Sequence, residues 1–295
     1  MLNRAILRPS LLAGCILIAS VAWGQQEEQS QLDFANGLFG RGFYGDAATE
    51  YRTYLDRYPE GAQRETALYR LGESQYSEKD YAGAAKTFSN LVAKYPDGTY
   101  LSRAQLREGV SLYRVKRYKE SQPMLIEVGR RANEPELKAE ALYYLGKLYA
   151  DTEQWSSSLK AYERLIKEVG SSSYAPFARY QLAAVYVAGN KFESAAVLYM
   201  GVGEDTSLNK SLQMDALYRA GEAYDSLGWH EAAAKSYSKL KDRFPASSYA
   251  QKADYGMAWS LYRSGAYDES MVTIEMFLKN HPGSALRPGL DYLKG

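Results

Sequence analysis

The chain has 295 residues, with 36 Lys plus Arg against 35 Asp plus Glu and a formal net charge of +1. Because a chain so close to neutral carries no strong basic field, nucleic acid is excluded as a partner. The single cysteine, Cys15, lies in the N-terminal leader, so the mature chain is predicted to lack disulfides, thiol nucleophiles and Cys-ligated metal sites.

Residues 1–24 have the features of a secretory signal peptide. Arg4 and Arg8 precede an apolar run over residues 11–22, and Ala22-Trp23-Gly24 places small residues before a cleavage site at Gln25. An apolar run of about twelve residues is too short to cross roughly 30 Å of hydrocarbon, which argues against a membrane anchor. We therefore expect export to the periplasm with cleavage after Gly24.

A second interpretation of the leader is a lipoprotein signal. The sequence Leu-Ala-Gly-Cys at residues 12–15 resembles a lipobox, which would lead to acylation of Cys15 and an outer-membrane lipoprotein. Cys15 follows Arg8 closely, and the residues after Cys15 are still apolar, which favours simple cleavage. Membrane association is expected only if Cys15 is lipidated. The polar residues 25–31 have no apolar period and are predicted to form a flexible tether.

A repeated pattern organises the rest of the chain, and residues 67–96 are its template. If Gly72 is position 8 of a repeat, Tyr81 is position 17, Ala84 is position 20 and Phe88 is position 24. Steps of 37 residues, with one extra residue before the sixth copy, reach a small residue at position 8 every time: Ala35, Gly72, Gly109, Gly146, Ala183, Gly221 and Ala258. Small residues at positions 8 and 20 predict two helices that cross closely, because larger side chains would overpack the contact.

Each copy reads as a helix, a short turn and a second helix. The first helix carries apolar residues at i, i+3, i+4 and i+7, and several second helices end at a Pro such as Pro59 or Pro96. Position 17 supplies an aromatic residue or His in the turn, and position 24 supplies a bulky apolar residue. The copies begin near residues 28, 65, 102, 139, 176, 214 and 251, with a partial eighth near 288.

This is the tetratricopeptide pattern. The resemblance implies an all-α protein, a right-handed α-α superhelix over residues 32–295 with seven helix-turn-helix repeats and part of an eighth. The 37-residue period and the Tyr-Pro helix ends, carried mostly by residues 67–114, resemble bacterial envelope proteins of the BamD and CpoB (YbgF) types. That resemblance implies a periplasmic scaffold that binds partner proteins. Since Gly295 falls inside the eighth unit, we expect either a frayed terminal cap or a piece of a longer protein.

No catalytic constellation is found in the sequence. His230 occupies the turn position 17, and His281 occupies the place that Tyr58 and Tyr95 hold in other repeats, so both are interpreted as packing residues. No Gly-rich phosphate loop follows a strand, and no HExxH motif occurs. The sequence predicts neither an enzyme nor a bound cofactor or metal.

The predicted binding surface is a band of aromatic residues. In tetratricopeptide superhelices the first helices line the concave face, with positions 2, 5, 9 and 12 pointing into it, and positions 5, 9 and 12 share one helix face. The residues predicted there to bind a partner are Tyr69, Tyr76, Tyr113, Tyr143, Tyr180, Tyr218, Tyr255, Trp259 and Tyr262. The alternative is that these rings pad the wall between adjacent helices.

Two functions follow from this surface. The first is a scaffold whose Tyr-lined groove holds an extended or helical segment of an envelope protein, serving envelope assembly or division. The second is a non-catalytic module that binds cell-wall glycan or regulates an enzyme acting on it. The Lys and Asn of the carboxylate clamp found in chaperone-binding relatives are replaced by Tyr69 and Glu73, which argues against that ligand class.

Overall fold

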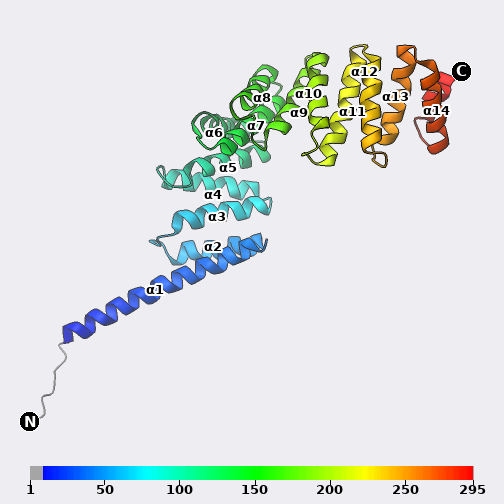
Figure 1. The fold of residues 1–295 in the computed structure, drawn as a ribbon. Helices are drawn as coiled ribbons and strands as arrows, with labels where there is room; N and C mark the ends of the chain where they lie inside the picture. Colours follow the sequence, from blue (N-terminus) through cyan, green and yellow to red (C-terminus); the bar gives the residue numbers. More distant parts are fainter. Residues whose placement is uncertain (1–8, 295) are drawn as a thin grey trace, which may run out of the picture. The chain divides into compact units, whose positions relative to one another are not determined.

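The computed structural model describes residues 9–294, with side chains described for residues 25–294. Helices are the only regular secondary structure in this range (Figure 1), and the chain divides into two compact units, the first ending at residue 137 and the second beginning at residue 138. The helices of the first unit are α1 (Pro9–Gly40), α2 (Tyr44–Arg57), α3 (Arg64–Ser77), α4 (Tyr81–Lys94), α5 (Leu101–Arg114) and α6 (Tyr118–Arg131).

The second unit contains nine helices within the described range, beginning with α7, whose first turn precedes the division between the units. They are α7 (Pro135–Asp151), α8 (Trp155–Val169), α9 (Ala175–Ala188), α10 (Phe192–Glu204), α11 (Lys210–Ser226), α12 (His230–Arg243), α13 (Ala250–Ser264), α14 (Tyr267–Asn280) and α15 (Arg287–Lys294). The predicted all-α helix-turn-helix fold is confirmed. Every second helix begins at position 17, the turn position of the sequence pattern.

Position 8 is small because the bulky side chain at position 24, an aromatic ring in several repeats, lies against it. A Cβ atom added to Gly72 would lie 2.6 Å from the Phe88 ring, and one added to Gly146 would lie 2.5 Å from the Tyr162 ring. Both separations are shorter than any ordinary contact between carbon atoms. In these two repeats the ring on the second helix therefore packs directly against the backbone of the first helix.

Position 20 is small for steric reasons, and where it is serine it also forms a hydrogen bond. The hydroxyl of Ser121 donates to the Gly109 carbonyl at 2.7 Å, that of Ser158 to the Gly146 carbonyl at 2.8 Å, and that of Ser270 to the Ala258 carbonyl at 2.8 Å. The acceptor is always the position 8 carbonyl. Serine is thus tolerated at this buried position because its hydroxyl is satisfied inside the repeat.

Residues 25–31, predicted to be a flexible tether, belong instead to helix α1. Their polar side chains bind α2: the Tyr54 hydroxyl donates to Glu28 Oε1 at 2.6 Å, and Gln31 Nε2 donates to Glu50 Oε2 at 2.6 Å. An apolar period does not detect this packing because the contacts are hydrogen bonds. The predicted signal peptide, its cleavage site and Cys15 lie outside the residues whose side chains are described.

At the other end, α15 packs as a short helix against the preceding repeat. Leu290 and Leu293 are buried with Ile274 and Phe277, so the apolar stripe of the partial eighth unit is covered. Tyr292, at position 5 of that unit, is 78% exposed. None of the helices in the described range is both apolar enough and long enough for a membrane span.

Candidate partner-binding site

We define the first-helix face as the surface carried by positions 2, 5, 6, 9 and 12 of the first helices. Successive first helices contact each other at several places: α3 contacts α5 in the first unit, and α11 contacts α13 and α13 contacts α15 in the second. This inner layer carries all nine aromatic residues predicted to bind a partner. Their exposure differs from one position to the next.

The tyrosines at position 5 are largely part of the wall. Tyr69 is only 9% exposed, and Tyr143, Tyr180 and Tyr218 are half-buried. Each of these rings packs against the position 24 ring of its own repeat, at centroid distances of 5.9 Å for Tyr69–Phe88, 6.2 Å for Tyr143–Tyr162, 5.2 Å for Tyr180–Tyr199 and 5.7 Å for Tyr218–Tyr237. Most of the position 5 tyrosines therefore pad the wall between adjacent helices, as the alternative interpretation predicted.

A third tyrosine, at position 36, completes the cluster in three repeats and was missed by the sequence analysis. Tyr100 stacks on Tyr69 at 4.4 Å, Tyr174 packs on Tyr143 at 5.5 Å, and Tyr249 packs on Tyr218 at 5.5 Å. Each of these tyrosines directly precedes a first helix. The signal was present in the sequence as a tyrosine recurring at one repeat position, although it lies in the linker, where packing residues are not expected.

Position 12 pairs with the turn aromatic at position 17. Tyr76 lies 5.1 Å from Tyr81, Tyr113 lies 5.7 Å from Tyr118, and Tyr262 lies 5.3 Å from Tyr267. Tyr113 is buried, whereas Tyr262 is 42% exposed and Tyr267 is 62% exposed. On α13, Tyr255 and Trp259 are half-buried neighbours at 6.3 Å. The exposed part of the aromatic band therefore lies on α13 and the start of α14.

The sixth repeat replaces this aromatic pair by a polar one. Asp225 takes position 12, and its Oδ1 lies 2.9 Å from Nδ1 of His230 at position 17 and 2.9 Å from the Ser260 hydroxyl of α13. The prediction that His230 packs in the turn agrees with this placement. The imidazole of His230 therefore links the start of α12 to Asp225 of α11.

Arginines at position 6 join neighbouring repeats in the first unit. The guanidinium of Arg70 lies over the Phe39 ring at 5.1 Å, and that of Arg107 lies over the Tyr76 ring at 5.1 Å. Arg107 Nε also donates to Glu73 Oε1 at 2.8 Å. We call this arrangement, an arginine over the position 12 ring of the preceding repeat, the arginine ladder.

Position 2 of α11 holds a hydrogen-bonded carboxylate. Asp215 accepts hydrogen bonds from the hydroxyls of Tyr180 and Tyr249, the latter at 2.5 Å, and from Arg219 Nε at 2.9 Å. Burial acts to raise the pKa of Asp215, but these hydrogen bonds outweigh it and lower that pKa. Burial and the same carboxylate raise the pKa of Tyr180. At neutral pH the carboxylate is therefore ionised, and the hydroxyl of Tyr180 is committed to it.

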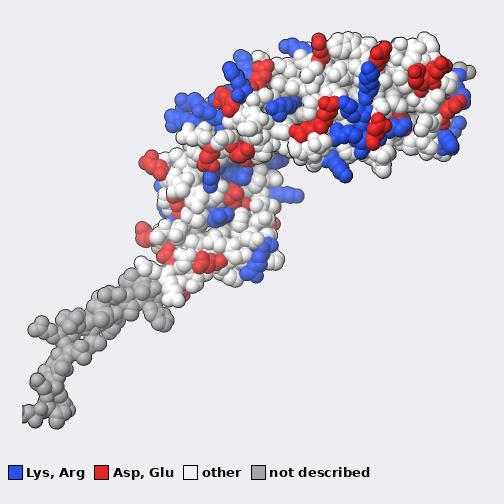
Figure 2. Space-filling view, viewed as in Figure 1, with Lys and Arg blue, Asp and Glu red and all other residues white. Residues whose placement is uncertain are grey.

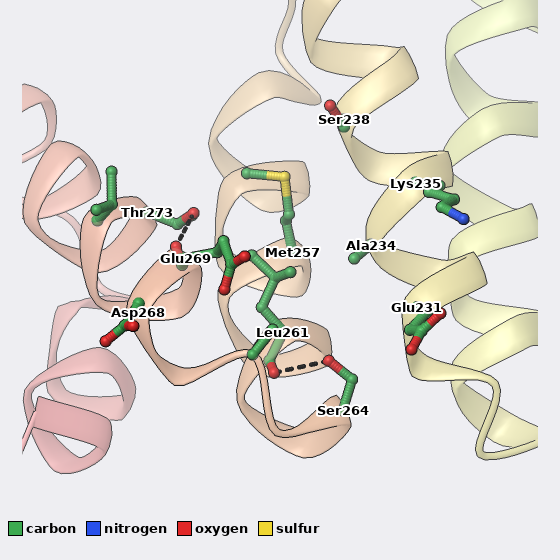
Figure 3. Close-up of a pocket in the computed structure, with 12 residues that line it drawn as sticks. Glu231, Ala234, Lys235, Ser238, Met257, Leu261, Ser264, Asp268, Glu269 and Thr273 are labelled. Atoms are coloured by element: carbon green, nitrogen blue, oxygen red, sulfur yellow. Dashed lines mark hydrogen bonds between the residues drawn. The ribbon is translucent and has the colours of Figure 1, made fainter.

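The opposite face of the second unit has a separate hollow of about 720 Å³ between α12, α13 and α14. Figure 3 shows Met257 and Leu261 rising between the flanking helices, with the carboxylates of Glu231 and Glu269 nearby. Similar hollows recur over α9, next to Leu182, and over α5, next to Glu108. They come from the regular spacing of second helices, and none includes a predicted binding residue. Figure 2 shows acidic and basic side chains interspersed over the visible surface.

Comparison with known families agrees with the repeat pattern. Models of the tetratricopeptide repeat match residues 32–99 and 140–172, and a model described as an outer membrane lipoprotein, YfiO, matches residues 210–295. The chain is a tetratricopeptide-repeat protein that resembles the BamD-like family. Over 101 residues it is 30% identical to the outer membrane protein assembly factor BamD of Neisseria meningitidis serogroup B, which covers 34% of this chain and 36% of that protein. The match thus spans little more than a third of that relative.

Solved structures share the fold at low identity. A tetratricopeptide-repeat fragment from Cytophaga hutchinsonii is 14% identical with a TM-score of 0.69, covering 88% of this chain and 98% of that one. A tetratricopeptide-repeat protein from Parabacteroides merdae is 11% identical with a TM-score of 0.58, covering 91% and 98%. PilF of Pseudomonas aeruginosa is 18% identical with a TM-score of 0.56, covering 76% and 95%. These similarities concern the fold alone.

Proposed function

We propose that this protein is a non-catalytic periplasmic scaffold of the cell envelope whose first-helix face holds a segment of another envelope protein. Tetratricopeptide repeats make the chain a protein-interaction scaffold, and its resemblance to an outer membrane assembly factor favours a role in envelope assembly. The observation that carries the proposal is the exposed pair of Tyr262 and Tyr267, which lies beside the half-buried ring of Trp259. Exposed aromatic surface of this kind is typical of an interaction site.

Within this proposal the nine aromatic residues have different roles. Tyr69 and Tyr113 are buried and support the surface, and Tyr143, Tyr180 and Tyr218 present only part of each ring. In the second unit Tyr255, Trp259 and Tyr262 are the proposed direct contacts, and in the first unit Tyr76 is a separate one. Aromatic anchors dominate interface energetics, so these contacts are expected to provide most of the affinity.

The test is capture of partners from an envelope extract. Replacement of both Tyr262 and Tyr267 by Ala is expected to reduce capture about tenfold or more, since each desolvated ring contributes roughly 1–3 kcal/mol to an interface. The melting temperature is expected to change little because both rings are largely exposed. The matched control is Val272→Ala, an exposed residue on the opposite face. Undiminished capture by the double variant would disprove the proposed surface.

The second candidate, a glycan-binding module, is favoured by the same exposed rings, because flat aromatic faces also stack on sugars. Binding to purified peptidoglycan distinguishes the two functions. Loss of peptidoglycan binding on Tyr262→Ala, with protein capture unchanged, would favour the glycan module over the scaffold.

Export is tested by the intact mass of the protein recovered from the periplasm. We expect a chain that begins at Gln25. A species that begins at Cys15 with added acyl mass would instead establish the lipoprotein. Cys15→Ala is the matched variant, because it abolishes membrane association only if the thiol is acylated.

A further inference from the structure

A third arginine at position 6, in the sixth repeat, lacks the ring partner that Arg70 and Arg107 have in the arginine ladder. Arg219 on α11 has the same repeat position as Arg70 and Arg107, but the preceding repeat has Val187 at position 12, where those arginines meet Phe39 and Tyr76. In the second repeat, position 9 is Glu73, which accepts a hydrogen bond from Arg107. In the fifth repeat the same position is Ala184, which offers no such partner to Arg219. Arg219 binds Asp215 of its own helix instead, and its side chain stays 46% exposed.

A hollow lies where the missing ring and carboxylate would be. Its volume is about 140 Å³, and it is lined by residues of α9, α10 and α11 within the second unit, among them Ala184, Val187, Phe192, Arg219, Glu222 and Ala223. Val187 is 37% exposed. The hollow therefore opens on the first-helix face, and its lining combines apolar side chains with the charged groups of Arg219 and Glu222.

We propose that this hollow is a subsite for a phenylalanine or tyrosine side chain of the partner segment. The inference rests on the proposed function and specifies what the first-helix face recognises. An apolar cavity of about 150 Å³ accommodates a benzene ring, so a single six-membered ring matches the volume. In the first unit the corresponding place is filled by a residue of the chain itself, because the Tyr76 ring lies beneath the guanidinium of Arg107.

The walls select an aromatic side chain over other types. A ring gains a cation–π interaction with the guanidinium of Arg219, which an aliphatic side chain does not. An acidic side chain would meet the carboxylate of Glu222, which lines the same hollow. Ala184, Val187 and Ala223 supply apolar surface for the faces of a ring, and the hydroxyls of Tyr199 and Ser226 complete the lining.

The probe is N-acetylphenylalaninamide, compared with the tyrosine and leucine analogues, on the full-length protein with labelled alanine and valine methyl groups. The aromatic amides are expected to shift the Ala184, Val187 and Ala223 methyl signals saturably and to bind at least about fivefold more tightly than the leucine analogue, as a cation–π gain of about 1 kcal/mol implies. Intermolecular contacts between ring protons and the Val187 methyls locate the probe without any variant. Equal binding of the leucine analogue, or shifts elsewhere only, would overturn the proposal.

A double variant, Ala184→Glu with Val187→Tyr, fills the hollow with the residue types of Glu73 and Tyr76. It is expected to lose amide binding at least about tenfold, the effect of about 1.4 kcal/mol, while its melting temperature does not fall. Arg263→Gln, which removes an arginine stacked over Trp259 elsewhere on this face, is the control and is expected to bind normally. Retained binding in the double variant would contradict the subsite.

The two proposals fail independently. The amides require no partner protein, so loss of envelope capture with intact amide binding would reject the proposed function and leave the subsite. Absent amide binding with intact capture would reject the subsite alone.

Discussion

The residue at position 15 of every repeat has a left-handed backbone. Gly42, Gly228 and Gly265 have φ between 76° and 85°, whereas Lys79, Lys116, Glu153 and Asn190 have φ between 56° and 65°. A side chain in this region costs about 1–2 kcal/mol, a cost that glycine avoids. The sequence pattern gives no sign of this, because only some copies carry the glycine.

Lys116→Gly is therefore expected to raise the free energy of unfolding by about 1 kcal/mol. Chemical denaturation measures the change. The matched control is Lys86→Gly in the interior of helix α4, which is expected to lower stability by about 1 kcal/mol because glycine is a poor helix former. A destabilised Lys116→Gly variant would mean that the turn relaxes in solution to another backbone conformation.

Glu108 is a buried carboxyl on α5, only 8% exposed, next to Ser89. Burial raises the pKa of Glu108, and a hydrogen bond with Ser89 offsets part of this effect. The pKa of Glu108 is higher in the folded than in the unfolded protein. Below pH values of about 4.3, the ordinary carboxyl pKa, Glu108 is protonated in both states, and its burial then costs least stability. Its ionisation destabilises the fold as the pH rises through that value and the raised pKa.

Glu108→Gln is expected to raise the melting temperature at pH 7 and to leave it nearly unchanged at pH 4, because the amide removes the buried charge and keeps the contact with Ser89. Thermal melts at the two pH values test this. Glu134→Gln, which removes an exposed carboxylate paired with Arg103, controls for the loss of a surface charge. An equal effect of Glu108→Gln at both pH values would contradict the assignment.

At the scale of helices, the features that could be predicted from the sequence are those that depend on recurring residues or on apolar periodicity. The starts of the second helices at position 17 follow from the turn aromatic, and the close contact within a repeat follows from small residues at positions 8 and 20. The helical part of residues 25–31 was missed because Glu28 and Gln31 bind α2 through hydrogen bonds, which leave no apolar period. The burial of Tyr69 was missed because its partner Tyr100 comes from the linker rather than from a helix.

The stacked pair of Tyr69 and Tyr100 couples α3 to the start of α5. Tyr100→Ala is expected to lower the free energy of unfolding by about 2 kcal/mol, since a half-buried ring is lost together with an aromatic contact. Tyr100→Phe is the matched control and is expected to be nearly neutral, because the ring and the backbone N–H donated to Glu65 at 2.8 Å are kept. Equal losses of stability in the two variants would mean that the hydroxyl of Tyr100, rather than its ring, provides the stabilisation.

At the scale of the whole molecule, the helix contacts in the described part of the chain join consecutive helices or successive first helices such as α11 and α13. Stability in such a stack is close to a sum of repeat terms and nearest-neighbour interfaces. A strong local disturbance should therefore weaken its own repeat first and spread only to the neighbouring ones.

Gly146→Leu provides such a disturbance, because the Cβ alone would lie 2.5 Å from the Tyr162 ring. Overpacking of this kind costs roughly 1–3 kcal/mol or more, so a clear fall in melting temperature is expected. Lys160→Ala on α8 is exposed and serves as the control with little expected change. Hydrogen exchange then resolves where the loss is felt: exchange should accelerate in α7 and α8, less in α9 and α10, and remain unchanged in α13 and α14. Equal acceleration along all helices would show a single cooperative unit and contradict nearest-neighbour stacking.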